Sequence, residues 1–506
     1  MRYIKLCLVL LPLFALAQQS PVEQVRKHVQ AQARVIMQSY QEFLSIPNIA
    51  SDMPNIERNA AWIAHQMRSL QIDKVQLLYA ATKGVPPAVY GEVMTPGATQ
   101  TLIFYAHYDG QPVDSTKWAA GLHPFKPSLY TDALQNGGKP IAYDQASYEP
   151  QWRIYGRGAS DDKAGVMAIL QAYEALKVNG IAPKVNIKFF FEGEEEAGSD
   201  HLHEILQANQ ALLKGDLWVI CDGPVHQSGQ QQIVFGVRGD THLEITVFGP
   251  KRPLHSGHYG NWAPNPGMLL AKLLASMKDV SGKVLVKGFY DDVTPLSAAE
   301  KAALAKVPPV EAALQKELGI AQAENPKRSL AEAINQPSLN INGITVAGTG
   351  KYSANVIPVK AVASIDLRLV MGNDWKKQQD KVIQHIQSQG YFVTSKEPTD
   401  EERMRYPKIA MVVRSGGYNA QKTSMQDPLA QKVVEAVSVA QGKVVLTPTL
   451  GGSLPLFVFE QYLKTPPVTV PIANHDNNQH AENENIRLKN LFEGIVTFAS
   501  IMLLPK

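Results

Sequence analysis

Residues 188–199 read Lys-Phe-Phe-Phe-Glu-Gly-Glu-Glu-Glu-Ala-Gly-Ser, an aromatic run joined to a cluster of carboxylates. The apolar run predicts a buried strand over residues 185–191. An acidic run is most often a solvated loop. These carboxylates, however, stand where a buried strand ends, and open α/β sheets place their ligand sites at strand ends. The stretch therefore predicts either a solvated turn or a metal-binding or acid–base site.

Strands and helices alternate on both sides of this stretch. The sequence predicts buried strands at 101–106 and 217–221 and helices at 164–178 and 200–213. Alternation of this kind is typical of a mostly parallel sheet that helices cover on both faces. We therefore expect an α/β domain around the acidic cluster.

A different pattern begins near residue 237. Residues 241–248 and 361–369 alternate apolar and polar side chains, which is typical of strands with one exposed face. Helices are expected at 265–277 and 375–388. These elements predict a smaller α+β unit.

The length of the chain supports two domains. Its 506 residues exceed the roughly 250–300 at which a single hydrophobic core stops growing. We expect an α/β catalytic domain with a mostly parallel mixed sheet at 18–236 and 398–506. The smaller α+β unit would be an inserted lid domain at 237–397.

Residues 1–17 have the pattern of a secretory signal peptide. Arg2 and Lys5 precede an apolar run, and Ala15-Leu-Ala17 is a cleavage signal. The run is too short to span a bilayer, and no later segment approaches 18 consecutive apolar residues. We therefore expect an exported protein, periplasmic or secreted, that has no membrane span.

The composition excludes some partners. Of the 49 basic residues, 47 remain when Arg2 and Lys5 are removed, against 46 acidic residues. The sequence therefore offers no electrostatic reason to bind nucleic acid. Of the two cysteines, Cys7 belongs to the predicted signal peptide. Cys221 then remains alone, which excludes an intramolecular disulfide and a multi-thiolate metal site.

Histidine and carboxylate side chains follow the predicted strands or open a helix. A lone histidine there is most often structural, and Asp161 has the alternative role of a helix cap. Together, imidazole and carboxylates are ligands for zinc, cobalt or manganese. Two such metals ~3.5–4 Å apart need a bridging carboxylate, and they both activate water and polarise a carbonyl. The clusters are His107 with Asp109, Asp161 with Asp162, Glu194–Glu196, and Asp222.

Five blocks of the sequence resemble the signature blocks of the M20 metallopeptidase family, most closely its carnosinase and dipeptidase branch. They occur in the family's order, which makes the resemblance more specific than any single block. The blocks are His107-Tyr-Asp-Gly110, Tyr155-Gly-Arg-Gly-Ala-Ser-Asp-Asp-Lys163, Phe191–Ser199, Leu254-His-Ser-Gly257 and Gln479-His-Ala-Glu-Asn-Glu484.

The resemblance implies a pair of divalent metal ions, most simply zinc, with manganese or cobalt as alternatives. It also implies a cis peptide bond before Asp162. His475 and Asp476 lie close to His480 in the sequence and are alternative ligands at that position. The matching ligands are Asp161 as the bridge, His107 and Asp222 for one metal, and Glu196 and His480 for the other.

Catalytic roles also follow from the resemblance. Glu195 matches the general base, and Asp109 would orient the ring of His107. His255 matches a lid-domain histidine that stabilises the oxyanion and that a partner subunit often supplies, which implies a homodimer formed through the lid domain. Without the resemblance, His255 would be interpreted as a turn residue.

Four further residues match contacts to the carboxylate of the substrate: Asn355, Arg368, Gly452 and Ser453. An arginine suits this task because its guanidinium binds a carboxylate with two parallel hydrogen bonds. The alternative for Arg368 is a solvent-facing strand residue.

These features predict an exported zinc hydrolase that cleaves dipeptides or short peptides with a free carboxylate, using water activated by two metals. An N-acyl-amino-acid deacylase or carboxypeptidase-like amidohydrolase would use the same site. An inactive periplasmic metal-binding protein would need neither Glu195 nor His255. A carboxylate-based glycosidase would leave the histidines unexplained.

Overall fold

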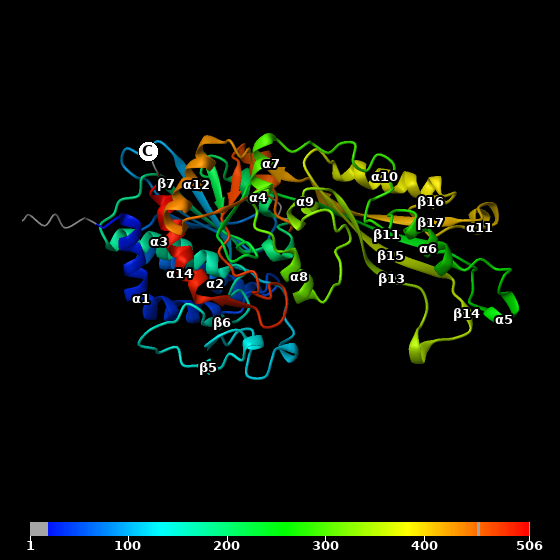
Figure 1. The fold of residues 1–506 in the computed structure, drawn as a ribbon, viewed down its shortest axis with the longest axis horizontal. Coiled ribbons are helices and arrows are strands. Elements are labelled where there is room, and N and C mark those ends of the chain that lie inside the picture. The colour runs from blue at the N-terminus through cyan, green and yellow to red at the C-terminus, as the bar shows by residue number, and fades with distance from the viewer. Residues whose placement is uncertain (1–18, 453–455, 505–506) are drawn as a thin grey trace, which may run out of the picture.

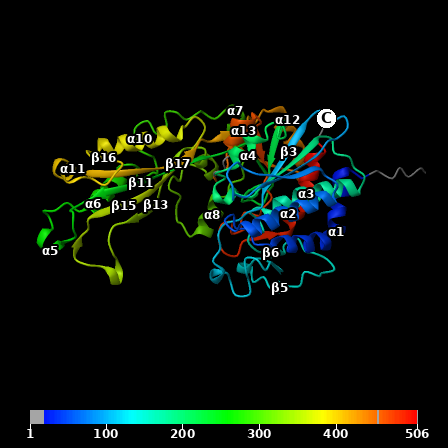
Figure 2. The same cartoon turned by 180° about the vertical axis from the view of Figure 1, so that it is seen from behind.

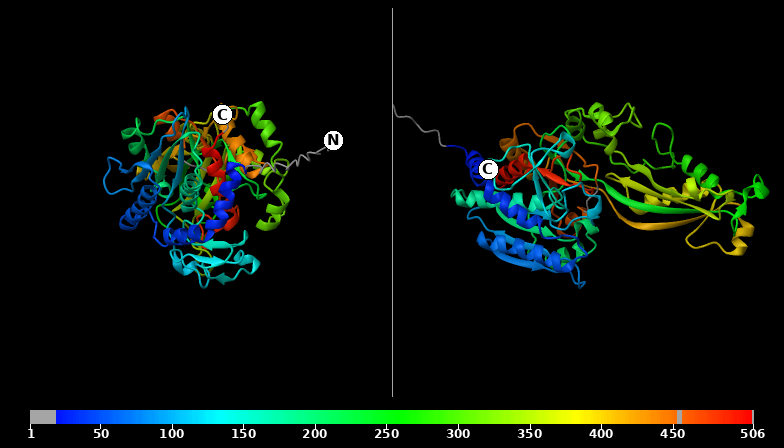
Figure 3. Two further views of the ribbon diagram at one scale, coloured as in Figure 1. Left: turned by 90° about the vertical axis from the view of Figure 1, so that its left-hand side faces the viewer. Right: turned by 90° about the horizontal axis from the view of Figure 1, so that it is seen from below.

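The computed structural model describes residues 19–452 and 456–504, so the predicted signal peptide and Ser453 lie outside the described residues. The chain forms an elongated molecule of two lobes (Figures 1 and 2). The first lobe contains both ends of the described chain, and the second lobe extends away from it as a long, narrow sheet (Figure 3, right). No helix of the described residues is both long and apolar enough to cross a membrane.

A mixed eight-stranded sheet forms the centre of the first lobe. Its middle strands β7, β3, β8 and β20 are parallel to one another, as predicted, whereas β1 and β2 pair antiparallel at one edge. In spatial order the strands are β1 (Asp73–Leu78), β2 (Ala88–Val93), β7 (Asn186–Glu192), β3 (Thr101–His107), β8 (Leu217–Ile220), β20 (Pro467–Thr469), β9 (Gln232–Val234) and β19 (Val445–Thr447).

Helices cover both faces of this sheet (Figure 1). The period of two along β7 separates its aromatic run: Phe189 and Phe191 join the core on one face, and Phe190 joins the core on the other. The helices on the first face are α1 (Pro21–Leu44), α2 (Met53–Ser69), α3 (Lys163–Val178), α12 (Pro428–Gln441) and α14 (Leu488–Met502). Those on the second face are α4 (Leu202–Ala208) and α13 (Phe457–Leu463).

A five-stranded sheet forms the second lobe, and its helices α6 (Pro266–Ala275) and α10 (Trp375–Ser388) contribute to one core with it. The predicted boundary at residue 397 falls short of this sheet, because β17 lies beyond it and pairs with β11. In spatial order the strands are β13 (Ser338–Thr345), β15 (Lys360–Leu369), β11 (Gly239–Phe248), β17 (Ile409–Tyr418) and β16 (Phe392–Thr394). Outside this sheet lie β12 (Leu254–His255), β14 (Val356–Ile357), α5 (Ser256–Tyr259) and α11 (Asp400–Arg405).

Two connections join the lobes. Strands β10 (Gly236–Val237) and β18 (Gln421–Lys422) form a short antiparallel ribbon where the chain enters and leaves the second lobe. Part of the predicted lid instead packs on the first lobe: α7 (Ala298–Leu304) lies against β19, and its Ala303 belongs to the core of the first lobe. Two short helices follow, α8 (Glu311–Leu318) and α9 (Leu330–Ile334).

A third, four-stranded sheet lies beside the main one, with the strands β21 (Asn485–Arg487), β6 (Arg153–Tyr155), β4 (Ser128–Tyr130) and β5 (Pro140–Ile141). Asn485–Arg487 pairs with β6, so α14 begins only at Leu488. The helix predicted at 200–213 ends early, at Ala208, where Asn209 donates its side-chain amide to the carbonyl of Ile205.

Candidate metal centre

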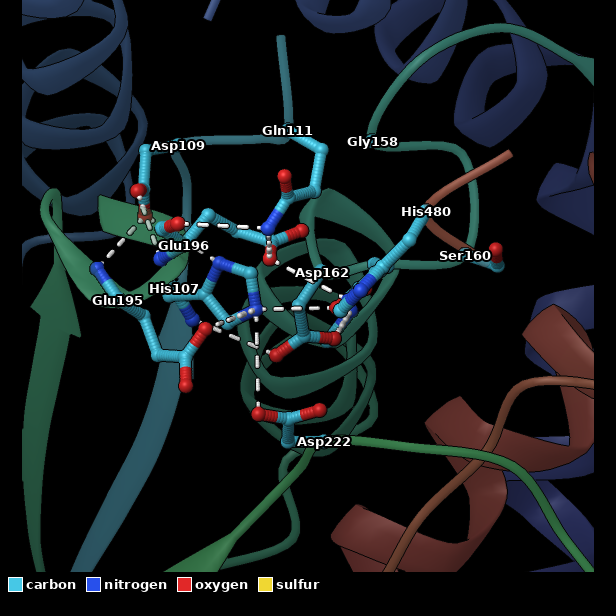
Figure 4. Close-up of polar contacts among 12 residues, drawn as sticks. His107, Asp109, Gln111, Gly158, Ser160, Asp162, Glu195, Glu196, Asp222 and His480 are labelled. Carbon is cyan, nitrogen blue, oxygen red and sulfur yellow. Dashed lines mark hydrogen bonds and ion pairs between the residues drawn. The ribbon is translucent and has the colours of Figure 1, made fainter. Parts of the chain in front are cut away.

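The ends of three neighbouring parallel strands bring the predicted side chains together (Figure 4). His107 is the last residue of β3, and it stands opposite Glu192 at the end of β7. Asp222 follows β8 by two residues. Because parallel strands end at the same edge of the sheet, residues from three distant parts of the sequence surround one point.

One group of potential ligands consists of His107, Glu195 and Asp222, whose ligand atoms lie within 4.8 Å of one another. The Nε2 atom of His107 is 3.8 Å from Oε2 of Glu195 and 3.8 Å from Oδ2 of Asp222. Such distances leave room for an ion between these atoms.

A second group consists of Asp161, Glu196 and His480. The Nε2 atom of His480 lies 3.1 Å from Oδ2 of Asp161 and 3.3 Å from Oε2 of Glu196. Neither His475 nor Asp476 occurs in the ligand groups that the described residues form. Asp476 is instead paired with Arg153, at 2.6 Å.

Asp161 faces both groups. Its Oδ1 lies 3.0 Å from Nε2 of His107, while its Oδ2 lies 3.1 Å from Nε2 of His480. The carboxylate thus has the orientation of a bridge between two ions. The peptide bond between Asp161 and Asp162 is cis, as the resemblance implied.

Asp109 connects the end of β3 to the acidic turn. Its carboxylate accepts hydrogen bonds from the backbone N–H groups of Glu195 and Glu196, at 3.1 and 3.0 Å. The same carboxylate lies 3.3 Å from Nδ1 of His107, so it can orient the ring whose Nε2 faces the centre. Asp109 therefore restrains both the backbone of the two glutamates and the ring of His107.

Two contributors were missed by sequence reasoning. Gln111 donates its side-chain amide to Oε2 of Glu196 at 2.8 Å. Glu484 accepts a hydrogen bond from the backbone N–H of Asp161 at 3.0 Å. Gln111 lies four residues after His107 and Glu484 four after His480, but both contacts join segments far apart in the sequence. Only the position of Glu484 within the last signature block pointed to it.

The electrostatics of the centre favour a cation. Burial raises the pKa of Asp222 to about 7 and that of Glu196 to about 8, and it also raises the pKa of Glu195. Despite burial, hydrogen bonds from His107 and His480 lower the pKa of Asp161. Glu195, Glu196 and Asp222 are therefore costly to ionise without a further positive charge, whereas Asp161 ionises readily beside the two histidines.

The donor set fits a pair of divalent metal ions. The buried Oδ2 of Asp222 accepts no hydrogen bond from any residue that the structure describes, although it points at the centre (Figure 4). Imidazole nitrogen and carboxylate oxygen are the ligands that zinc, cobalt and manganese share. A cation at this position would satisfy the unpaired oxygen.

His255 and Asn355 lie far from this centre within one chain. They stand side by side, because β12 pairs with β14 and the N–H of Ser256 donates to the carbonyl of Asn355 at 3.0 Å. Both neighbouring elements, α5 and β14, lie at the end of the second lobe that is farthest from the first lobe (Figure 1). The side chain of His255 accepts a hydrogen bond from the N–H of Gly257, at 3.1 Å.

The other predicted substrate contacts lie elsewhere. Arg368 is near the end of β15 that adjoins the lobe junction, where its Nε is 3.5 Å from Asp240 and 3.4 Å from Asp366. Gly452 is exposed in the turn after β19, and Ser453 lies outside the described residues. No substrate contact at these positions is tested by the geometry, so their roles stay predictions.

Comparisons with known proteins agree with this geometry. The profile of peptidase family M20/M25/M40 matches residues 103–504. The chain is 28% identical to the Cys-Gly metallodipeptidase of Candida albicans over 91% of this chain and 93% of that protein. It is 26% identical to the Beta-Ala-His dipeptidase of Homo sapiens, over 92% of this chain and 85% of that protein.

Solved structures have the same fold. An M20 family metallo-carboxypeptidase from Sulfolobus solfataricus superposes with a TM-score of 0.74 at 28% identity, covering 93% of this chain and 98% of that one. Human carnosine dipeptidase 1 superposes with a TM-score of 0.71 at 23% identity, covering 95% and 99% of the two chains. The second similarity concerns the fold alone.

Proposed function

Because the chain belongs to peptidase family M20/M25/M40 and is therefore a hydrolase of peptide or related amide bonds, we propose that it is an exported, zinc-dependent dipeptidase. The observation that carries this proposal is the orientation of Asp161, whose two carboxylate oxygens face separate ligand groups. A binding protein for one metal would not need such a bridge.

Five side chains would hold the two ions: Asp161 between them, His107 and Asp222 on one side, and Glu196 and His480 on the other. Two divalent cations bound there would act as Lewis acids that polarise the peptide carbonyl and lower the pKa of water.

Glu195 is the proposed general base. Its side chain is 12% exposed, whereas those of Asp161, Glu196 and Asp222 are at most 4% exposed, so Glu195 is the carboxylate best able to reach water. Its carboxylate would take a proton from the attacking water and return it to the nitrogen of the leaving amine.

The proposed substrates are dipeptides or short peptides with a free carboxylate. The relatives described above are named as dipeptidases, which supports this choice. Arg368, Gly452 and Ser453 are proposed to contact the substrate carboxylate. Arg368 has the charge that the contact needs, and its side chain is 30% exposed.

A homodimer is part of the proposal. His255 and Asn355 share the far end of the second lobe, so neither reaches the metal centre of its own chain in this structure. In a dimer, the far end of the second lobe of one copy would lie near the metal centre of the other copy. The His255 of the first copy would then stabilise the oxyanion in that centre. The partner would therefore complete the active site.

Export is proposed from the pattern of residues 1–17. Cleavage after Ala17 would make Gln18 the first residue of the mature chain. Mass spectrometry of protein recovered from a periplasmic extract tests this directly, and an intact Met1 in the fractionated native protein would refute it.

A substrate panel tests the activity. The purified mature chain, loaded with Zn²⁺, is assayed against dipeptides, tripeptides and N-acyl-amino acids. We expect dipeptides to be cleaved fastest. Hydrolysis of N-acyl-amino acids without cleavage of dipeptides would instead identify a deacylase at the same site.

A further inference from the structure

Glu484 is a buried carboxylate outside the proposed ligand set. Its exposure is 0%, and it follows His480 by four residues at the end of the same turn. Both carboxylate oxygens accept hydrogen bonds. Oε1 accepts from the N–H of Ser160 (2.9 Å), the hydroxyl of Ser160 (3.0 Å) and the N–H of Asp161 (3.0 Å). Oε2 accepts from Nη1 of Arg157 (2.7 Å) and the N–H of Gly158 (3.1 Å).

These contacts connect two segments that are distant in sequence. The first, between β6 and α3, carries Asp161, and the second, before β21, carries His480. Two backbone carbonyls of the second segment add further connections: that of Glu484 accepts from the N–H of Gly156, and that of Ala481 accepts from the side-chain Nη2 of Arg157. Asp161 and His480, two of the three residues of the second group, are thus held in relative position by the contacts of this buried carboxylate together with these two connections.

The turn that carries His480 needs such an anchor. His480 has a φ of 62° and Asn483 a φ of 61°, a left-handed conformation that is unfavourable for non-glycine residues. The side chain of His480 is also 54% exposed, so surrounding packing contributes little to its orientation. The contacts of Glu484 and Arg157 provide the restraint at the end of the turn.

We infer that Glu484 is a positioning residue that sets the bridging carboxylate of Asp161 and the imidazole of His480 at the distance a second divalent ion requires. This inference rests on the proposed two-metal site. It assigns Glu484 no contact with substrate or with either ion. Substitution should therefore weaken the site formed by Asp161, Glu196 and His480 more than the site that contains His107 and Asp222.

The chemistry of the contacts determines which substitutions are informative. All five partners of the carboxylate are donors, so in Glu484→Gln the new amide N–H groups would face other donors. Glu484→Asp keeps the charge but shortens the side chain by one methylene, which should preserve folding better while separating the two segments. Loss of an outer partner of a metal ligand typically lowers metal affinity by about 10–100-fold.

Asp476→Asn is the matched control. Asp476 also forms an ion pair on the turn before β21, with the buried side chain of Arg153, but it has no contact with Asp161. A general weakening of the turn would affect the control and the Glu484 variants alike. A positioning role predicts that only the Glu484 variants lose affinity at the second site.

The experiment is a calorimetric titration of the full, metal-free mature chain with Zn²⁺, together with its melting curve. The wild type should bind about two ions, and Glu484→Asp and Glu484→Gln should bind the second about 10–100-fold more weakly. Their kcat should fall with little change in KM, whereas Asp476→Asn should keep both affinities. Two wild-type affinities in Glu484→Asp, or equal losses in Asp476→Asn, would overturn the inference. A wild type that binds no divalent metal would overturn the proposed function itself.

Discussion

The substitution Glu195→Gln tests whether Glu195 is the general base or a metal ligand. Glutamine has the shape of glutamate but cannot accept the proton of the attacking water, and general-base catalysis typically contributes about 10²–10⁴-fold in rate. We therefore expect kcat to fall by this factor, about 3–5 kcal/mol of transition-state stabilisation, with little change in KM. The backbone N–H of Glu195 would still donate to Asp109, so the acidic turn should keep its conformation.

The same variant should retain about two metal ions per chain, because His107 and Asp222 would hold one ion together with Asp161 and would not need Glu195. The metal content distinguishes the two roles, because Oε2 of Glu195 lies 3.8 Å from Nε2 of His107, close enough for Glu195 to be a ligand. Metal content is measured by elemental analysis after dialysis, and kcat is measured with a cleaved dipeptide. Loss of one ion would reassign Glu195 as a ligand, and wild-type turnover would refute the mechanism. Glu194→Gln is the control, because Glu194 contacts His201 and belongs to neither ligand group.

Three further predictions concern the ions, the dimer and the acid stability. Chelation should abolish dipeptide hydrolysis and lower the melting temperature, and added Zn²⁺ should restore both; activity that persists in metal-free protein would contradict the proposal. Mixed Glu195→Gln and His255→Ala subunits should regain about a quarter of wild-type activity, because random pairing completes one site in each mixed dimer; a mixture that stays inactive would place His255 outside the partner's site. Burial raises the pKa of Asp476, but hydrogen bonding to Arg153 outweighs it and lowers this pKa to about 2 from its usual 3.8. The pair therefore stabilises the fold above pH ~4, and this stabilisation is lost as the pH falls toward 2. Asp476→Asn should therefore cost about 2 kcal/mol at pH 7 and little near pH 2 in urea unfolding, and an equal cost at both values would contradict this.

Local patterns predicted the central strands of the first lobe, and the family resemblance implied the roles of the residues at its centre. The aromatic run before Glu192 has the length and composition of a buried strand, and it forms β7 within one residue of the prediction. The side chains at the ends of β3, β7 and β8 meet because parallel strands end at one edge. Their convergence at one edge could be predicted from the alternation of strands and helices along the sequence, but the distances between the side chains could not.

Contacts between distant segments could not be predicted in this way. The membership of β17 in the second sheet and of β21 in the third depends on pairing partners, which their own sequences do not reveal. The support from Gln111 and Glu484 likewise consists of single hydrogen bonds across long sequence separations. The remoteness of His255 follows from the length of the second lobe.

The residue types of the centre and their places at strand ends are therefore properties of the sequence, because periodicity and charge are local. The tertiary structure alone shows that Asp161 faces two ligand groups. It also shows how the acidic cluster is oriented: Glu195 and Glu196 face different groups, while Glu194 pairs with His201. The reason is physical: a side chain's direction is set by the segments packed around it, and here those segments come from opposite ends of the chain.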